Sequence, residues 1–203
     1  MVTFRKVRTA GAAAIAAALG LWAGALRAEA GSVVAPTKAA APAVSVMSGE
    51  DGAYRIEGSF RVGASAPVAW AVLTDYDNLS SFVSSMRASV ATRDASGRLL
   101  VTQEAVGRAG PFARTLTVVL EVTEDAPARI AFRDLCAGSF HSYTGAWAIT
   151  PEDDGVRVTY TLEARPRSSP PLFARSILAS NARGLLEQVR LEMLRRGRTA
   201  SAY

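Results

Sequence analysis

Between Ala88 and Ala164 the chain consists of short runs in which apolar and polar residues alternate, separated by turn residues. Alternation with a period of two is typical of strands with one buried face, and it is clearest at 116–122 and 156–162. Because the connections are short, consecutive strands must be antiparallel neighbours. Strands are expected at 88–93, 99–106, 115–122, 129–133, 139–150 and 156–164, with a loop at 107–112.

Another pair of strands and two short helices are expected upstream of this run. Residues 43–46 and 54–62 alternate on either side of turn residues, which is typical of a hairpin. Ser65 and Pro67 then supply a cap residue and a proline near the first helical position, followed by apolar residues at helical spacing. We expect this helix to end at 75–78 and a second short helical turn over 79–86.

One long helix is expected near the C-terminus, at about 172–196, after the Pro170–Pro171 pair. Its apolar residues form one stripe, and Arg183 and Arg190 are expected on the opposite, solvated face. The stripe comprises Leu178, Ala182, Leu185, Leu186, Val189 and Met193. The buried face of the antiparallel sheet is its only available partner, so the sequence predicts an α+β fold in which side chains fill the space between sheet and helix or leave a cavity.

The N-terminus has the pattern of a cleaved signal peptide. Three basic residues at positions 5, 6 and 8 precede an apolar run at 10–26, and the small-x-small sequence Ala28–Glu29–Ala30 follows. We expect cleavage near Ala30 and a periplasmic or secreted mature protein. An uncleaved anchor is the alternative, although about 17 residues are few for spanning a bilayer. Residues 31–42 are expected to be a flexible linker, 43–198 a single domain and 199–203 a disordered tail.

The net charge of +5 and the pI of about 9.9 do not describe the expected mature protein. Without residues 1–30 the net charge falls to +2, divided between −4 for residues 31–164 and +6 from Arg165 onward. This distribution does not indicate a nucleic-acid partner. With one Cys and one His the chain cannot provide a Cys- or His-rich metal site, and we expect no metal or cofactor.

Three strings resemble the START-like, helix-grip (SRPBCC) superfamily, and within it the polyketide cyclase/dehydrase and coenzyme-Q-binding branch. They are residues 64–79 (ASAPVAWAVLTDYDNL), residues 142–147 (SYTGAW) and the Pro-Pro pair before an Arg-rich helix. The resemblance covers about 43–196. It implies a curved antiparallel sheet wrapped around a long C-terminal helix, with two short helices after the first main strand. It also implies a deep apolar cavity that holds lipids, polyprenoid quinones or polyketides; some members cyclise or dehydrate polyketides and many only bind.

The candidate ligand-binding residues are large apolar or aromatic side chains of the expected strands and long helix, because an apolar ligand needs poorly hydrated walls. Core packing explains each aromatic side chain equally well when it is taken alone. The candidates are Leu116, Val118, Phe132, Tyr143, Trp147, Tyr160, Phe173, Leu178, Leu185 and Val189. The polar groups that orient a ligand could be Tyr143, Tyr160, Gln103 or Glu104, although strand parity does not place the last two inside.

No catalytic residue is assigned. Asp75 and Asp77 could form an acid/base pair, but Asp at a helix end more often makes turn hydrogen bonds. His141 lacks a nucleophile-elbow string such as G-x-S-x-G, and it is expected to be a surface or hydrogen-bonding residue. Cys136 is expected to be a small packed or loop residue rather than a nucleophile.

The C-terminal arginines have two interpretations. They could dock the helix on anionic lipid headgroups. Alternatively they form a solvated face, with pairs to Glu187 and favourable interactions with the helix dipole. The residues concerned are Arg183, Arg190, Arg195, Arg196 and Arg198.

Three functions follow from these observations. The first is an exported protein that holds a hydrophobic lipid-, quinone- or polyketide-like ligand without covalent chemistry. The second is an enzyme of the cyclase/dehydrase kind, in which a Tyr, Arg or His moves protons; the export signal argues against it, because polyketide assembly is cytoplasmic. The third is a protein-interaction module, as in the ribosome-associated toxin relatives of the superfamily.

Overall fold

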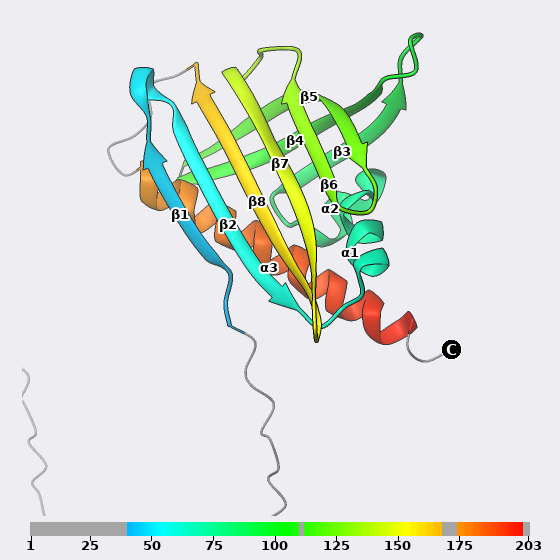
Figure 1. Cartoon of the computed structure of the whole chain (residues 1–203). Coiled ribbons are helices and arrows are strands. Elements are labelled where there is room, and N and C mark those ends of the chain that lie inside the picture. Colours follow the sequence, from blue (N-terminus) through cyan, green and yellow to red (C-terminus); the bar gives the residue numbers. More distant parts are fainter. Residues whose placement is uncertain (1–39, 110–111, 168–173, 201–203) are drawn as a thin grey trace, which may run out of the picture. The chain divides into compact units, whose positions relative to one another are not determined.

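The computed structural model describes residues 40–109, 112–167 and 174–200, which form an eight-stranded antiparallel sheet with a long helix across one face (Figure 1). The strands are β1 Ala43–Ser48, β2 Tyr54–Val62, β3 Met86–Arg93, β4 Leu99–Ala109, β5 Phe112–Asp125, β6 Arg129–Asp134, β7 Phe140–Glu152 and β8 Gly155–Pro166. The helices are α1 Ala66–Leu73, α2 Leu79–Phe82 and α3 Ala174–Ala200, with single 3₁₀ turns η1 at Glu50–Gly52 and η2 at Tyr76–Asn78. This is the predicted α+β helix-grip architecture.

The strand order is β1-β2-β8-β7-β6-β5-β4-β3, so the second strand of the chain lies next to the last one. β2 pairs with β8 over its whole length, from Tyr54 opposite Ala164 to Val62 opposite Val156. The segment with α1, η2 and α2 leads from β2 to β3 at the far edge. The sheet curves around α3 and its two edge strands, β1 and β3, do not pair with each other (Figure 1).

The expected strands and the two short helices are present, but three boundaries were wrong. The loop expected at 107–112 is mostly paired strand, because Arg108 lies opposite Ala113 and Ala109 opposite Phe112. Antiparallel strands need only two connecting residues, so pairing continues until the chain must reverse. For the same reason β7 and β8 extend into the turn expected at 151–155. The second helix covers only Leu79–Phe82, and Met86 already belongs to β3.

The long C-terminal helix is present, and one of its side chains contradicts the predicted face. α3 continues to Ala200, so the first two residues of the expected tail are helical. Arg190 was expected in solvent but is only 8% exposed. Its guanidinium forms two hydrogen bonds to the Glu187 carboxylate, at 2.6 and 2.9 Å, which compensate its charge beside the sheet.

α3 packs closely on β2 at a glycine, Gly58. Leu186 is fully buried on the sheet-facing side of the helix, directly over Gly58. A Cβ atom at position 58 would overlap the Leu186 Cδ1 atom. The absence of a side chain at Gly58 therefore allows Leu186 to contact the β2 backbone.

Side chains also attach the inserted segment and α3 to the two edge strands. The Asp77 carboxylate accepts a hydrogen bond from the Ala91 backbone N–H of β3 at 2.7 Å. The Arg175 guanidinium at the start of α3 donates to the Val46 carbonyl of β1 at 3.1 Å.

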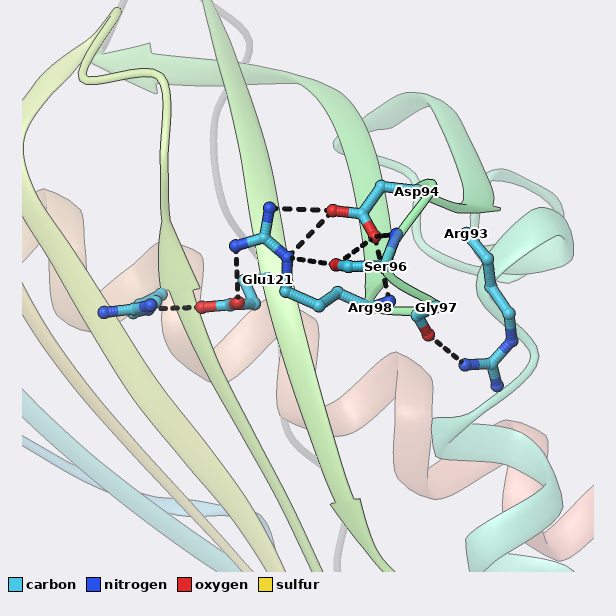
Figure 2. A network of polar contacts seen from close by, with 7 residues as sticks. Arg93, Asp94, Ser96, Gly97, Arg98 and Glu121 are labelled. Carbon is cyan, nitrogen blue, oxygen red and sulfur yellow. Dashed lines mark hydrogen bonds and ion pairs between the residues drawn. The ribbon is translucent and has the colours of Figure 1, made fainter.

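On the outer face of the sheet an ionic network joins the β3–β4 turn to β5 and β6 (Figure 2). Arg98 bonds to Asp94 at 2.7 Å and to Glu121 of β5 at 3.3 Å, and the second Glu121 oxygen accepts from Arg133 of β6. Hydrogen bonds from Ser96 and Arg98 lower the pKa of Asp94 to about 2. Since Arg98 and Arg133 are more than half exposed, the network orders the β3–β4 turn and adds little to stability.

A second ionic cluster fixes the C-terminal part of α3. Glu192 accepts hydrogen bonds from Arg195 and Arg196 at 2.6–2.7 Å, and Arg196 also bonds to the Asp75 carboxylate at 2.7 Å. The Arg196 guanidinium lies over the Phe82 ring, 5.7 Å from its centroid. These contacts attach α3 to the segment that connects α1 to α2.

This cluster predicts a specific pH dependence of stability. Hydrogen bonds from Arg195, followed by those from Arg196, lower the pKa of Glu192 to about 2 in the folded protein, although burial opposes this shift. The stabilisation is therefore present above the unfolded-state pKa of about 4.3 and is lost as the pH falls towards 2. Thermal unfolding should show a smaller loss of stability between pH 5 and 2 for Glu192→Gln than for the wild type.

The matched control is Glu163→Gln, which removes an exposed carboxylate 3.7 Å from Arg55 and should change stability little at neutral pH. Identical pH profiles for Glu192→Gln and the wild type would contradict the predicted role of Glu192.

Candidate ligand-binding cavity

A cavity of about 280 Å³ lies between the inner face of the sheet and α3. Its walls come from β2 to β8, from α1, from α3 and from the inserted segment between α1 and β3. Strand alternation directs every second side chain of β5 inward, so Leu116, Val118, Leu120 and Val122 form one continuous apolar wall. The sheet and the helix stripe therefore leave part of the space between them unfilled.

Nine of the ten predicted site residues lie in the wall of this cavity. They are Leu116, Val118, Phe132, Tyr143, Trp147, Tyr160, Leu178, Leu185 and Val189. The tenth, Phe173, lies outside the described residues. Of the two polar candidates that parity could not place, Gln103 lines the cavity. Glu104 points away, and its carboxylate lies 3.9 Å from the Arg87 guanidinium.

Aromatic rings from three adjacent strands form one side of the cavity. Tyr160 lies 4.5 Å from Trp147 and 6.5 Å from Phe132, measured between ring centroids. Tyr143 lies 5.9 Å from Phe132 and 4.8 Å from Phe140. These tilted and stacked arrangements are favourable for aromatic pairs and present flat, polarisable surfaces to the cavity.

Gly145 makes this aromatic side possible. It lies on β7 between Tyr143 and Trp147, opposite Phe132 of β6. A Cβ atom at this position would be 2.5 Å from the Phe132 ring and would overlap the Thr161 carbonyl oxygen. The Phe132 ring therefore occupies the space that any larger side chain at 145 would need.

The cavity is polar at a few points but not charged. Within the described part of the chain, no Asp, Glu, Lys or Arg belongs to its wall. Burial raises the pKa of Tyr143 and of Tyr160, and the neighbouring Tyr143 hydroxyl raises the pKa of Tyr160 further. Both phenols are therefore neutral at physiological pH and can donate or accept a hydrogen bond.

The inserted segment closes the cavity on the side of β3. Tyr76 lines the cavity, and its hydroxyl donates to the Glu124 carboxylate at 2.6 Å. Ser84 forms two hydrogen bonds with the Gln188 amide of α3, at 2.6 and 3.0 Å. This segment is therefore attached to both the sheet and the helix.

The residues considered for catalysis have structural contacts elsewhere. Burial disfavours the charged form of Asp75, but hydrogen bonds from Asn78 and Arg196 outweigh it and lower the pKa of Asp75. Asp77 caps a β3 backbone N–H. His141 and Cys136 are exposed and lie outside the cavity wall. In the ranges that the structure describes, no group of three or more His, Cys, Asp or Glu could hold a metal ion.

Several wall residues were not predicted. Leu120 and Val122 share the parity of Leu116 and Val118, so the strand pattern alone could have indicated them. Ser85 and Asn181 could not be found in this way, because their positions depend on how the inserted segment and α3 meet the sheet.

None of the helices formed by the described residues is long and apolar enough to cross a membrane.

A curved sheet that encloses an apolar cavity against a C-terminal helix is the helix-grip arrangement that the sequence predicted. The family model for polyketide cyclase/dehydrase and lipid transport proteins matches residues 53–196. The chain therefore belongs to this family. No curated protein matches the chain in sequence.

Solved structures show the same fold at low sequence identity. Human STARD10 has a TM-score of 0.61 and 12% identity, with 81% of this chain and 74% of STARD10 covered. A STAR-related lipid transfer protein from Xanthomonas axonopodis has a TM-score of 0.56 and 18% identity, covering 74% and 98% of the two chains. The di-domain aromatase/cyclase StfQ of the steffimycin biosynthetic pathway has a TM-score of 0.54 and 15% identity over 71% of this chain, which spans about half (51%) of StfQ.

Proposed function

We propose that this protein is an exported binding protein that holds one neutral, apolar molecule in the cavity without covalent chemistry. The observation that carries the proposal is the cavity wall, which is apolar and aromatic and includes no charged side chain from the described residues. Such a wall favours transfer of an apolar molecule from water, and the two neutral phenols can orient one polar group of that molecule.

The size of the cavity limits the ligand. Small-molecule sites commonly measure roughly 300–1,000 Å³, so a cavity of about 280 Å³ suits one ring system or a single chain rather than a two-chain lipid. Burial of about 300 Å² of apolar ligand surface would contribute roughly 7 kcal/mol before ordering costs. A ligand can therefore be retained without a catalytic residue or an ion pair.

Leu185→Trp tests this function by filling the cavity from α3. Since Leu185 lines the cavity, the larger ring should occupy the ligand space and weaken binding of a fluorescent fatty acid or quinone by about tenfold or more. The matched control is Leu191→Trp, the same substitution on the outer side of the same helix, where Leu191 is 50% exposed. Equal binding by both variants would contradict the proposed site.

Mass spectrometry of the protein purified from its native host tests the ligand and the export together. We expect an apolar molecule in the organic extract and a mature N-terminus directly after Ala30. An empty extract together with no binding of the fluorescent probes would overturn the binding function. An intact residue 1 would overturn the export proposal alone.

A cyclase/dehydrase activity is the second candidate, favoured by the family description and by the two buried phenols in the cavity. In that case Tyr160 would be the residue that moves a proton, since His141 lies outside the cavity wall. Loss of product with Tyr160→Phe, at unchanged ligand affinity, would identify this activity. Absence of product with the wild type would leave binding as the function, whereas unchanged product formation with Tyr160→Phe would show that another group moves the proton.

A further inference from the structure

The inference concerns one end of the domain, where the cavity reaches the surface. Antiparallel pairing brings the β1–β2 turn, the β6–β7 loop, the end of β8 and the start of α3 to this end (Figure 1). Two exposed residues also line the cavity: Ser85, which directly precedes β3, and Asn181 in the first half of α3. We call this end of the domain the mouth end.

Two arginines at the mouth end are bonded to backbone carbonyls rather than to carboxylates. Arg167 donates to the Ala137 carbonyl at 2.6 Å, and Arg175 donates to the Val46 carbonyl at 3.1 Å. A backbone carbonyl orients a guanidinium but leaves its full positive charge. Arg165 is exposed, and its nearest carboxylate, that of Asp51, is 4.0 Å away.

Apolar side chains lie beside these arginines. Met47 is 44% exposed and follows the Val46 carbonyl that Arg175 binds. Leu135 is 43% exposed and lies two residues before the Ala137 carbonyl that Arg167 binds. These two are half of the large hydrophobic residues that are exposed in the described ranges. Basic and apolar groups interleave here, as they do at surfaces that bind a lipid interface.

Most of the acidic groups described at the mouth end have an ion-pair or hydrogen-bond partner. Glu104 pairs with Arg87 at 3.9 Å, and Asp134 accepts hydrogen bonds from the Val119 and Cys136 backbone N–H groups. Asp51 is a further exposed carboxylate, 4.0 Å from the Arg165 guanidinium.

The turns at the opposite end of the sheet carry exposed acidic residues. Asp153 and Asp154 lie in the β7–β8 turn and Asp125 begins the β5–β6 turn. All three are exposed and have no ion pair within the described ranges of the chain. Arg129, which lies opposite Asp125 in the β5–β6 ladder, is also exposed, so the charge at this end is mixed.

We propose that the mouth end docks on the surface of a bilayer that contains anionic lipid, with the arginines on the headgroups and Met47 and Leu135 in the interface. Docking there lets an apolar ligand pass between bilayer and cavity without exposing its surface to water, which costs about 25 cal/mol per Å². The surface is separate from the cavity wall, so docking does not depend on which ligand is bound.

This surface replaces the C-terminal helix face that the sequence indicated. Arg190, Arg195 and Arg196 of that face are paired with Glu187 or Glu192. Arg183 and Arg198 are exposed, and the described residues provide them with no ion pair. They are therefore suitable controls for a general charge effect.

The test is co-sedimentation of the purified protein with phosphatidylcholine vesicles that contain or lack phosphatidylglycerol. The wild type should bind only the anionic vesicles, and added salt should release it. The triple variant Arg165→Gln/Arg167→Gln/Arg175→Gln should bind roughly 100-fold more weakly, because each basic residue near the surface contributes about 1 kcal/mol. Glutamine keeps a donor for the two carbonyls.

Two matched triples complete the design. Arg165→Lys/Arg167→Lys/Arg175→Lys keeps the charge and should bind anionic vesicles. Arg129→Gln/Arg183→Gln/Arg198→Gln removes three charges elsewhere and should bind within a few-fold of the wild type. Equal weakening by the two glutamine triples, or equal binding of both vesicle types, would overturn the proposal. If the first triple unfolds, Met47→Ser/Leu135→Ser tests the same surface, and unchanged binding by it would overturn the proposal.

Discussion

Replacement of Gly145 with alanine is expected to destabilise the domain by about 3 kcal/mol, at the upper end of overpacking effects. The added methyl group would overlap the Thr161 carbonyl oxygen and approach the Phe132 ring to 2.5 Å. The carbonyl belongs to paired strand β8 and cannot move without loss of sheet hydrogen bonds. Urea unfolding monitored by circular dichroism measures the loss as a lower midpoint at an unchanged slope.

The partner substitution Phe132→Leu distinguishes the two contacts. It relieves the clash with the ring but not the clash with the Thr161 backbone, so it should restore only part of the stability of Gly145→Ala. Gly184→Ala is the control, because no atom lies within 4 Å of the added group in the middle of α3. That variant should gain up to about 1 kcal/mol. A fully stable Gly145→Ala protein would show that β7 and β8 are not packed as described.

Truncation of Leu186 to alanine should destabilise the domain by about 3 kcal/mol or more. Leu186 is fully buried where α3 packs on β2, directly over Gly58. Gly58→Ala alone should cost about 1–3 kcal/mol, because its methyl group would overlap the Leu186 side chain. In the double variant the new methyl group enters the space that Leu186 vacates, so the two losses should not add.

A double-mutant cycle measured by urea unfolding tests this contact. The expected coupling between positions 58 and 186 is about 1 kcal/mol or more in favour of the double variant. Leu191→Ala on the same helix is the control, since Leu191 is 50% exposed and its loss should change stability by less than about 0.5 kcal/mol. Strictly additive losses at 58 and 186 would contradict the close approach.

The strands and the long helix were predictable because their patterns have one period each. Alternation at 116–122 and 156–162 fixed both the strands and the inward face. Boundaries were less predictable, since extension of β4 and β5 depends on partner strands rather than on local residue preferences. Arg190 was misplaced for a related reason: helical spacing does not show that its pairing with Glu187 allows burial.

The cavity wall was predictable as far as it lies on regular elements. Strand parity and the helix stripe indicated nine described wall residues, and Gln103 could be separated from Glu104 only by the structure. The contribution of the inserted segment to the cavity wall was not predictable. Tyr76 and Ser84 are positioned by Glu124 and Gln188, which are 48 and 104 residues away in sequence. Single-sequence patterns contain no information on such distant pairs.

The two side chains that reach the edge strands have a consequence for how copies of this protein meet. An open sheet offers unpaired backbone groups on its first and last strands, and these groups can template addition of a strand from a neighbouring molecule. Here the Asp77 carboxylate occupies an N–H of β3 and the Arg175 guanidinium occupies a carbonyl of β1. Each edge strand therefore has one backbone group bonded to a charged side chain of the same molecule. This disfavours pairing of the open sheet with the edge strand of a second molecule.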